Sequence, residues 1–568
     1  MQVDLLVKDV YIYNSAFKSF IHGDAAIIAD KFYHIGKDTM NQLEAKEVVA
    51  GQKRYMVPGL IDIHLHIESS MVTPKAFSHE LIRNGVTTVV TDPHEIANVF
   101  GVEGIKAMIA AGGECQADIF YGIPSSVPST NLETSGAVID MPEIEELLKE
   151  EKVVCLGEVM NYMEVINEPH GKTNQILRYI KQNYPLLTIE GHCPMLMDLD
   201  LSRYIFAGVD SDHTHQTAAG LQARIAMGMF VEIQEKSMTT EVMDYLQEAP
   251  VKEHFCFVTD DVMPDSFMEK GHLNYLIKKA MKMGMEPEQA IYAATYTPAK
   301  RMKLLDRGSI APNKLADFIL LNNLDTFAID EVYKSGKKVY AAGEKYTPAH
   351  GKKEFPEKFY QSVQREIIIS KDLEIHAPVK DGSCQCRVMM VSDGSTFTKE
   401  KIAPVPTANY LLEWEKSPYC LAGVFERYGK NGNIGLGLVG GEIIQRGAIA
   451  TTYAHDHHNL LVVGKSQEDF LIAANEVIKN QGGYCVVENG KVLAFAALPI
   501  GGILSEKYLE DLSKEIVYLK SMMISLGYKH YNPIMSFSTL GLPVSPELKI
   551  TDKGLVKVTE GKLVNLFI

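Results

Sequence analysis

The chain has 568 residues, which is too long for one ordinary hydrophobic core and predicts about two to four domains. Hydrophobic residues make up 46% of it and its mean hydropathy is −0.05, values typical of a soluble globular protein, and no apolar run approaches the roughly 20 residues that span a bilayer. The formal net charge of −16 argues against nucleic acid as a partner, because phosphate binding favours a basic surface.

The N-terminus and the cysteines indicate the compartment. Residues 1–9 include an early acid and lack the basic-then-apolar order of a secretory signal. The eight cysteines are scattered along the chain and form no Cys-x-x-Cys pair, so neither a zinc ribbon nor a disulfide framework is indicated. We therefore expect a cytoplasmic protein without a membrane segment.

The first part of the chain predicts a small β layer, followed by a barrel. Short strand-like runs separated by turns fill residues 1–56 and predict the first part of a β-sandwich. From Val57 onward, apolar runs alternate with helix-like segments such as 142–149. Eight βα units over about 250 residues are typical of a (β/α)₈ barrel, which we expect over residues 57–305. The eight apolar runs are 59–64, 87–92, 118–123, 153–158, 187–192, 208–213, 228–234 and 255–260.

The remaining sequence predicts two further parts. Strand-and-turn sequence returns at 308–340 and predicts the second part of the β-sandwich, residues 306–350. A segment rich in Lys, Glu and Pro near 348–357 predicts a linker, and residues 360–568 predict an additional α+β domain. The expected fold class is therefore α/β, a metal-dependent (β/α)₈ barrel with a β-sandwich layer from both flanks and a C-terminal α+β domain.

Residues that can bind metals follow the ends of the apolar runs. His64 and His66 are spaced i and i+2, so their side chains project from the same face of a strand, as two ligands of one metal would. The carboxyl ends of barrel strands form the face where active sites are built. Each histidine alone is equally well explained as a buried, hydrogen-bonded residue. Taken together, the strand-end residues predict two divalent metals, with Glu158 as the bridge. The predicted ligands are His64, His66, Glu158, His192, His213 and Asp260.

Two acids suit proton transfer. Asp260 ends the eighth run, where a carboxylate beside a metal-bound hydroxide can accept a proton and pass it to a leaving amine. Glu95 could protonate a nitrogen of a substrate ring if burial raised its pKa, and the alternative for it is an acid at the start of a helix. Asp261 better fits an N-cap or a solvated turn.

Two further patterns have alternative interpretations. Gly435-x-Gly437-x-x-Gly440 matches a nucleotide-binding pattern, but no clear βαβ frame surrounds it, so we interpret it as a Gly-rich turn between strands. Ala454-His-Asp-His457-His458-Asn459 predicts exposed loop histidines, with a contribution to a site at a domain interface as the alternative.

Several of these motifs together resemble a known superfamily. Pro58-Gly-Leu-Ile-Asp-Ile-His-Leu-His66, the later single histidines, and Thr297-Pro-Ala-Lys before a Gly-Ser-Ile-Ala-Pro turn are similar to the amidohydrolase superfamily. Within it the chain most closely resembles the bacterial adenine deaminases, and the resemblance covers nearly the whole chain. The matching segments are 66–71, 92–99, 191–194, 259–261, 454–456, 498–502 and 536–543.

The resemblance implies a binuclear metal centre that holds Mn²⁺ or Fe²⁺, with Zn²⁺ as the alternative. It implies that a metal-bound hydroxide attacks C6 of adenine to give hypoxanthine and ammonia, a reaction of purine salvage. By position it makes Glu95 the proton donor to the purine ring and Asp260 the proton shuttle. We expect three further residues to contact the substrate and the protein to form a homo-oligomer. The three residues are Asp92, Glu235 and Asp261.

The chain departs from the family's pattern in loops near the substrate rather than at the metal ligands. These departures are Thr214 after His213, the segment 234–237, Val262 and the segment 270–274. They leave open a paralogue with the same metal chemistry that acts on another purine-like ring or a cyclic amide. A catalytically silent scaffold is a third interpretation, and the retained metal ligands argue against it.

Overall fold

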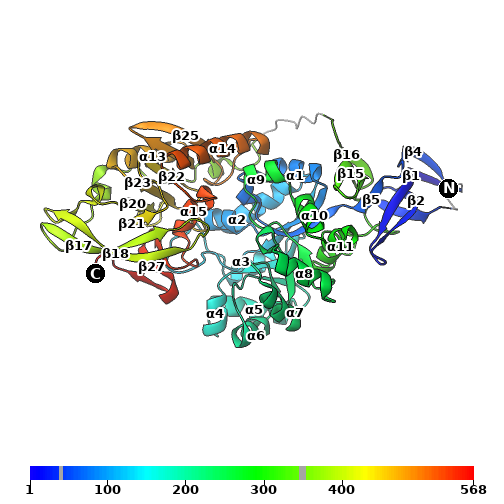
Figure 1. Cartoon of the computed structure of the whole chain (residues 1–568), viewed down its shortest axis with the longest axis horizontal. Helices are drawn as coiled ribbons and strands as arrows, with labels where there is room; N and C mark the ends of the chain where they lie inside the picture. Colours follow the sequence, from blue (N-terminus) through cyan, green and yellow to red (C-terminus); the bar gives the residue numbers. More distant parts are fainter. Residues whose placement is uncertain (38–41, 345–352) are drawn as a thin grey trace.

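The computed structural model of the chain describes residues 1–37, 42–344 and 353–568. Three parts follow one another along the long axis: a β-sheet at the end that holds the N-terminus, an α/β body, and a C-terminal part (Figure 1). Within the described ranges no helix combines the length and the apolar character needed to cross a membrane. Residues 348–352 of the linker expected near 348–357 lie outside the described residues.

Both flanks of the α/β body contribute strands to one additional sheet. The N-terminal strand β5 pairs with β14 from beyond the body in antiparallel fashion, with Phe318 opposite Pro58. The sheet has the order β16-β15-β14-β5-β1-β2-β3, and β4 pairs with β1. Its strands are β1 Gln2–Asn14, β2 Ser19–Ile28, β3 Lys31–Gly36, β4 Glu44–Ala50, β5 Tyr55–Pro58, β14 Phe318–Asn323, β15 Ala328–Lys334 and β16 Lys337–Ala341.

The α/β body contains eight parallel strands at the positions expected from the sequence. Five of them form a curled sheet of order β10-β9-β8-β7-β6, and three form a second sheet of order β11-β12-β13. Strands such as β7 are buried along their whole length, which explains their nearly continuous apolar and threonine sequence. The strands are β6 Leu60–Leu65, β7 Val86–Thr91, β8 Asp118–Ile123, β9 Val153–Val159, β10 Thr188–Gly191, β11 Ser211–Asp212, β12 Phe230–Ile233 and β13 Phe255–Phe257.

Helices follow these strands, and local sequence signals set where they begin. Proline stands in the first turn of α1, α3, α9 and α11, where its missing N–H costs no helical hydrogen bond. Thr217 and Thr239 cap α7 and α8 by accepting hydrogen bonds from the backbone N–H groups of Gly220 and Val242. The helices are α1 Pro74–Arg83, α2 His94–Gly112, α3 Met141–Leu147, α4 Tyr162–Asn167, α5 Lys172–Asn183, α6 Asp198–Ala207, α7 Ala218–Ala226, α8 Thr240–Glu248, α9 Pro264–Lys270, α10 Leu273–Lys282, α11 Pro287–Ala293 and α12 Tyr296–Arg301.

The C-terminal part is built on a nine-stranded sheet of order β19-β18-β17-β21-β20-β23-β22-β24-β25. Helix α13 buries Phe470, Ala473, Ala474 and Val477, a spacing of i, i+3, i+4 and i+7 that forms one apolar face. Its elements are β17 Gly382–Val391, β18 Thr398–Ala408, β19 Leu411–Leu412, β20 Cys420–Phe425, β21 Ile434–Gly441, β22 Ala448–Thr451, β23 Leu460–Gly464, α13 Gln467–Lys479, β24 Gly483–Glu488, β25 Lys491–Ala497, α14 Leu509–Ser525, α15 Pro533–Ser538, β26 Leu548–Thr551, β27 Gly554–Lys557 and β28 Lys562–Val564.

The C-terminal part packs directly on the α/β body. Val72 forms a parallel bridge with Ser505, and the rings of Phe100 and Phe359 lie 4.0 Å apart between centroids. Helix α14 packs against α9 (Figure 1). The two parts therefore share one continuous apolar core.

The interpretation of Gly435–Gly440 as a turn is wrong, because this segment lies inside strand β21. It pairs with β20 in antiparallel and with β17 in parallel fashion. A Cβ on Gly435 would lie 1.9 Å from the carbonyl oxygen of Thr551, and one on Gly437 would lie 2.8 Å from the side chain of Leu555. The glycines thus allow the β26–β27 hairpin to approach the strand closely.

We predict that Gly435→Ala lowers the free energy of unfolding by about 1–3 kcal/mol, because the added methyl group overpacks the strand against the hairpin. Gly113→Ala is the control, since Gly113 has a helical φ of −66° at the end of α2 and the atom nearest to an added Cβ lies 3.3 Å away. Urea unfolding followed by circular dichroism compares the two variants. Equal midpoints for both would contradict the packing argument.

Candidate metal centre

Two histidines at the end of β6 face the interior of the α/β body. His64 lies within the strand, His66 follows it, and both side chains are buried. The Nδ1–H of His66 donates to the backbone oxygen of Asp92 at 2.9 Å. This hydrogen bond fixes the tautomer and leaves Nε2 of His66 free as a ligand. That Nε2 lies 3.5 Å from Oε1 of Glu158 and 3.5 Å from Oδ1 of Asp260.

Glu158 lies between two groups of histidines. Its Oε1 faces His66, whereas its Oε2 lies 2.7 Å from Nδ1 of His192 and 3.3 Å from Nε2 of His213. Its backbone N–H donates to Oδ2 of Asp92 at 2.8 Å, which anchors the end of β9. A carboxylate whose two oxygens face different imidazole sets can bridge two cations.

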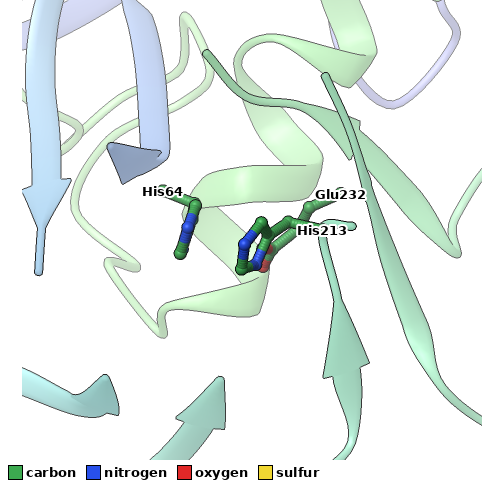
Figure 2. Close-up of side chains that lie close together, drawn as sticks. All are labelled: His64, His213 and Glu232. Atoms are coloured by element: carbon green, nitrogen blue, oxygen red, sulfur yellow. The ribbon is translucent and has the colours of Figure 1, made fainter. Parts of the chain in front are cut away.

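A third grouping brings His64 and His213 together with a residue that the sequence analysis missed. The rings of His64 and His213 stack with centroids 3.7 Å apart, and Glu232 of β12 approaches both (Figure 2). One ligand atom from each of the three lies within 4.8 Å of the others. Glu232 lies inside the strand rather than at its end, so a search of strand ends could not find it.

Asp260 completes the cluster. It follows β13 with a left-handed φ of 59°, a backbone conformation that is uncommon outside glycine. Its Oδ1 lies 4.0 Å from Nε2 of His64, and its Oδ2 lies 4.0 Å from Nζ of Lys236. Burial alone would raise the pKa of this carboxyl, but the close approach of His66 and the charge of Lys236 hold it well below its usual range.

The structure therefore brings all six expected metal ligands into one cluster, in which five are buried and His192 is partly exposed, and their chemistry fits divalent cations. Nε2 of His64 and Nδ1 of His213 are buried without a hydrogen-bond partner among the described residues. Buried polar atoms normally have such partners. Imidazole lone pairs and carboxylates that face one another need positive charge between them, which a divalent metal supplies.

The three residues expected to contact a substrate lie in different surroundings. Asp92 is buried, and its Oδ2 is occupied by the backbone N–H of Glu158. Asp261 accepts a hydrogen bond from the hydroxyl of Ser69. The carboxylate of Glu235 lies in a partly exposed group with Nζ of Lys270 at 3.0 Å and the hydroxyl of Tyr275 at 2.6 Å.

The raised pKa on which the donor role of Glu95 depends is not found. Burial acts towards a higher pKa, but the neighbouring charges of His455 and His94 outweigh it and hold the pKa well below its usual range. Nε2 of His94 lies 3.5 Å from Oε1 of Glu95, and its Nδ1 lies 3.6 Å from Oε1 of Glu158. The sequence analysis missed His94, although it stands in the same strand-end segment as Asp92 and Glu95.

The expectation of exposed histidines at 454–459 is also wrong. This loop connects β22 and β23, and His455, His457 and His458 are all buried. Nδ1 of His455 contacts Oε1 of Glu95, and Nε2 of His458 contacts Oε2 of the same carboxylate. The loop therefore lies at the domain interface, where the alternative interpretation expected it, and contacts Glu95 there.

Comparison with known proteins agrees with this geometry. A family model described as amidohydrolase family matches residues 55–339, and one described as adenine deaminase C-terminal domain matches residues 395–562. Adenine deaminase 2 of Shouchella clausii is 54% identical over 569 residues, which cover 100% of this chain and 99% of the relative. The adenine deaminase of Clostridium perfringens is 52% identical over 573 residues and 100% of both chains. The chain belongs to the adenine deaminase family of amidohydrolases. The resemblance found in the motifs is confirmed, and the fold is the α/β fold of this family with additional β-sheet domains.

We predict that this member of the adenine deaminase family binds two Mn²⁺ ions per chain and that His66→Asn reduces the bound metal, because the amide replaces an imidazole ligand. Metal analysis after dialysis gives the stoichiometry. Saturation at 100 times the dissociation constant should stabilise the wild type by about 2.7 kcal/mol for each bound ion, which a thermal melt detects. His376→Asn, at an exposed position, should match the wild type. Unchanged metal content in His66→Asn would contradict the assignment of this ligand.

Proposed function

We propose that this protein catalyses the hydrolytic deamination of adenine to hypoxanthine and ammonia. The observation that carries the proposal is full-length identity of 52–54% to proteins named adenine deaminase, combined with the convergence of all six expected metal ligands. None of the departures in the substrate loops replaces one of the six ligands, although Lys236 of the segment 234–237 lies 4.0 Å from Asp260, so the residues needed for the hydrolytic chemistry are retained.

The proposed cofactors are two divalent metal ions, Mn²⁺ or Fe²⁺ with Zn²⁺ as the alternative. When bound, such ions lower the pKa of a coordinated water towards neutrality and stabilise developing negative charge. Glu158 would stand between them, because its two oxygens face different histidines. The proposed ligands are His64, His66, Glu158, His192, His213 and Asp260.

The proposal includes one barrel over residues 57–305. The parallel bridge between Leu65 and Asp260 and the packing of β10 against β11 support it, because they connect the five-stranded and three-stranded sheets at both junctions. The corresponding domain limits are 1–56 and 306–350 for the flanking sheet and 360–568 for the C-terminal domain.

Asp260 is the proposed proton shuttle. It would accept a proton from the attacking water and deliver it to the exocyclic amine, which leaves as ammonia. Its carboxylate is ionised because its pKa is held low, so it can act as the base of the first step. Asp92 has a supporting role in this proposal, since its carboxylate holds the backbone of Glu158 and so fixes the bridging ligand.

We predict that the Mn²⁺-loaded protein releases ammonia from adenine and that Asp260→Asn lowers kcat by at least about 10²–10⁴-fold, the usual contribution of a general acid–base group. An enzyme-coupled ammonia assay measures the rate, with metal content determined on the same samples. Asp244→Asn is the control, because Asp244 is exposed on α8. A wild type with two bound ions that does not release ammonia from adenine would overturn the substrate, and full activity in Asp260→Asn would overturn the shuttle.

A further inference from the structure

The carboxylate of Glu95 is held between two histidines of the C-terminal domain. Glu95 is 1% exposed, His455 is 5% exposed and His458 is 0% exposed. Glu95 and His458 are 363 positions apart along the chain. Each oxygen of the carboxylate has its own imidazole partner. The arrangement is thus a buried carboxylate–imidazole group at the domain interface and not a surface contact.

His458 has a defined tautomer. Its Nδ1 accepts a hydrogen bond from the backbone N–H of Ala454 at 3.2 Å, so Nδ1 carries no hydrogen. The hydrogen of the neutral ring is therefore on Nε2, which donates to Oε2 of Glu95. A ring with this tautomer does not offer Nε2 to a metal ion. The group around Glu95 is accordingly a hydrogen-bonded system and not a third metal site.

His455 has one nitrogen engaged and one free. Its Nδ1 faces Oε1 of Glu95, whereas its Nε2 is buried without a hydrogen-bond partner among the described residues. The charged and titratable groups around it are Glu95, Asp261, Asp456, His457 and His458, with the ring of Tyr453 at 5.0 Å between centroids. Burial lowers the pKa of His455, but the charge of Glu95 outweighs burial and raises it well above its usual value. The imidazolium form is therefore stabilised.

The pair formed by Glu95 and His455 lies next to the cluster of proposed metal ligands. A single imidazole, His94, spans the distance between Oε1 of Glu95, at 3.5 Å, and Oε1 of Glu158, at 3.6 Å. On the other side, Asp261 directly follows the ligand Asp260, and its charge acts on His455. His455 thus stands between the segments that follow β7 and β13, at the carboxyl ends of the parallel strands.

We propose that His455 is the catalytic proton donor to the purine ring and that Glu95 is its positioning residue, so that the C-terminal domain completes the active site. The inference rests on the proposed adenine deamination. A buried carboxylate that accepts from Nδ1–H orients an imidazole and stabilises its protonated form, while Nε2 exchanges the proton with the substrate. Sequence analysis assigned the donor role to Glu95 itself, which is ionised here.

The proton balance of the step is complete. As the water oxygen bonds to C6, the C6–N1 π electron pair moves onto N1, and N1 takes the Nε2 proton of His455. Asp260 takes one proton of the water and passes it to the amine, which leaves as ammonia with the electron pair of the C6–N bond. The second water proton is released to solvent as the C6 carbonyl forms, and His455 regains a proton from solvent. Adenine and water thus give hypoxanthine and ammonia.

The direct test is His455→Ala in the Mn²⁺-loaded full-length protein, with kcat and KM measured on adenine. We expect kcat to fall at least about 10²-fold, KM to change little, the metal content to stay at two ions, and added imidazole to restore part of the rate. His457→Ala is the matched control. His457 is a buried histidine of the same loop whose Nδ1 accepts from the backbone N–H of Asn459 at 2.9 Å, and it makes no contact with Glu95.

A second variant keeps the inference testable if His455→Ala does not fold. Glu95→Gln is isosteric and removes the charge that stabilises the His455 imidazolium. Because the protonated form is the active one and its pKa falls, the alkaline limb of the pH profile of kcat should move to lower pH. A proton resonance downfield of the amide region, from Nδ1–H of His455, should also be present in the metal-free wild type and absent in Glu95→Gln.

Four outcomes would overturn the inference. These are an unchanged kcat in His455→Ala, equal losses in His455→Ala and His457→Ala without rescue by imidazole, an unmoved alkaline limb in Glu95→Gln, or a third metal ion that is lost with His455. Failure of the proposed function itself is distinguishable, because the wild type would then release no ammonia from adenine.

Discussion

Burial of opposing imidazoles and carboxylates at the carboxyl ends of the parallel strands is the constraint on which the rest of this structure depends. Such groups cannot be desolvated together at low cost unless positive charge lies between them. Supporting hydrogen bonds fix their positions before any cation binds. Asp62 accepts from the backbone N–H of His64 at 3.2 Å and from the hydroxyl of Thr259 at 2.7 Å. It thereby ties β6 to the segment that presents Asp260.

The C-terminal domain is part of the same polar arrangement. Arg427 is fully buried, and its Nε–H donates a hydrogen bond to the backbone oxygen of His458 in the 454–459 loop. The same guanidinium donates to the backbone oxygen of Gly501 at 2.6 Å and to the hydroxyl of Ser362 at 2.7 Å. Five rigid donors in one plane suit this role better than the single ammonium of a lysine would. The loop that meets Glu95 is thus positioned from three segments of its own domain.

The sequence was informative where local periodicity decides the structure. The eight parallel strands follow from eight apolar runs, and six of these runs end in His, Asp or Glu. The expected ligands converge because parallel strands present their carboxyl ends at one edge. Contacts between distant segments could not be predicted in this way. The pairing of Glu95 with His455 and His458 depends on how two domains pack, and it reverses the expected pKa shift of Glu95.

Two other differences have a similar origin. Glu232 approaches His64 and His213 from inside a strand, so the position of a residue relative to a strand end does not reveal it. The Gly435–Gly440 segment has the composition of a turn, yet it forms strand β21 because the β26–β27 hairpin requires a surface without side chains. In both cases the tertiary neighbour, which is remote in sequence, decides the outcome.

The most direct measurement is a crystal structure of the manganese-loaded protein with hypoxanthine, using anomalous scattering to locate the ions. The account predicts two anomalous peaks on opposite sides of the Glu158 carboxylate. It also predicts that a ring nitrogen of the purine lies within hydrogen-bond distance of Nε2 of His455. A metal peak between Glu95 and the histidines of the C-terminal domain, or a purine bound away from His455, would contradict it.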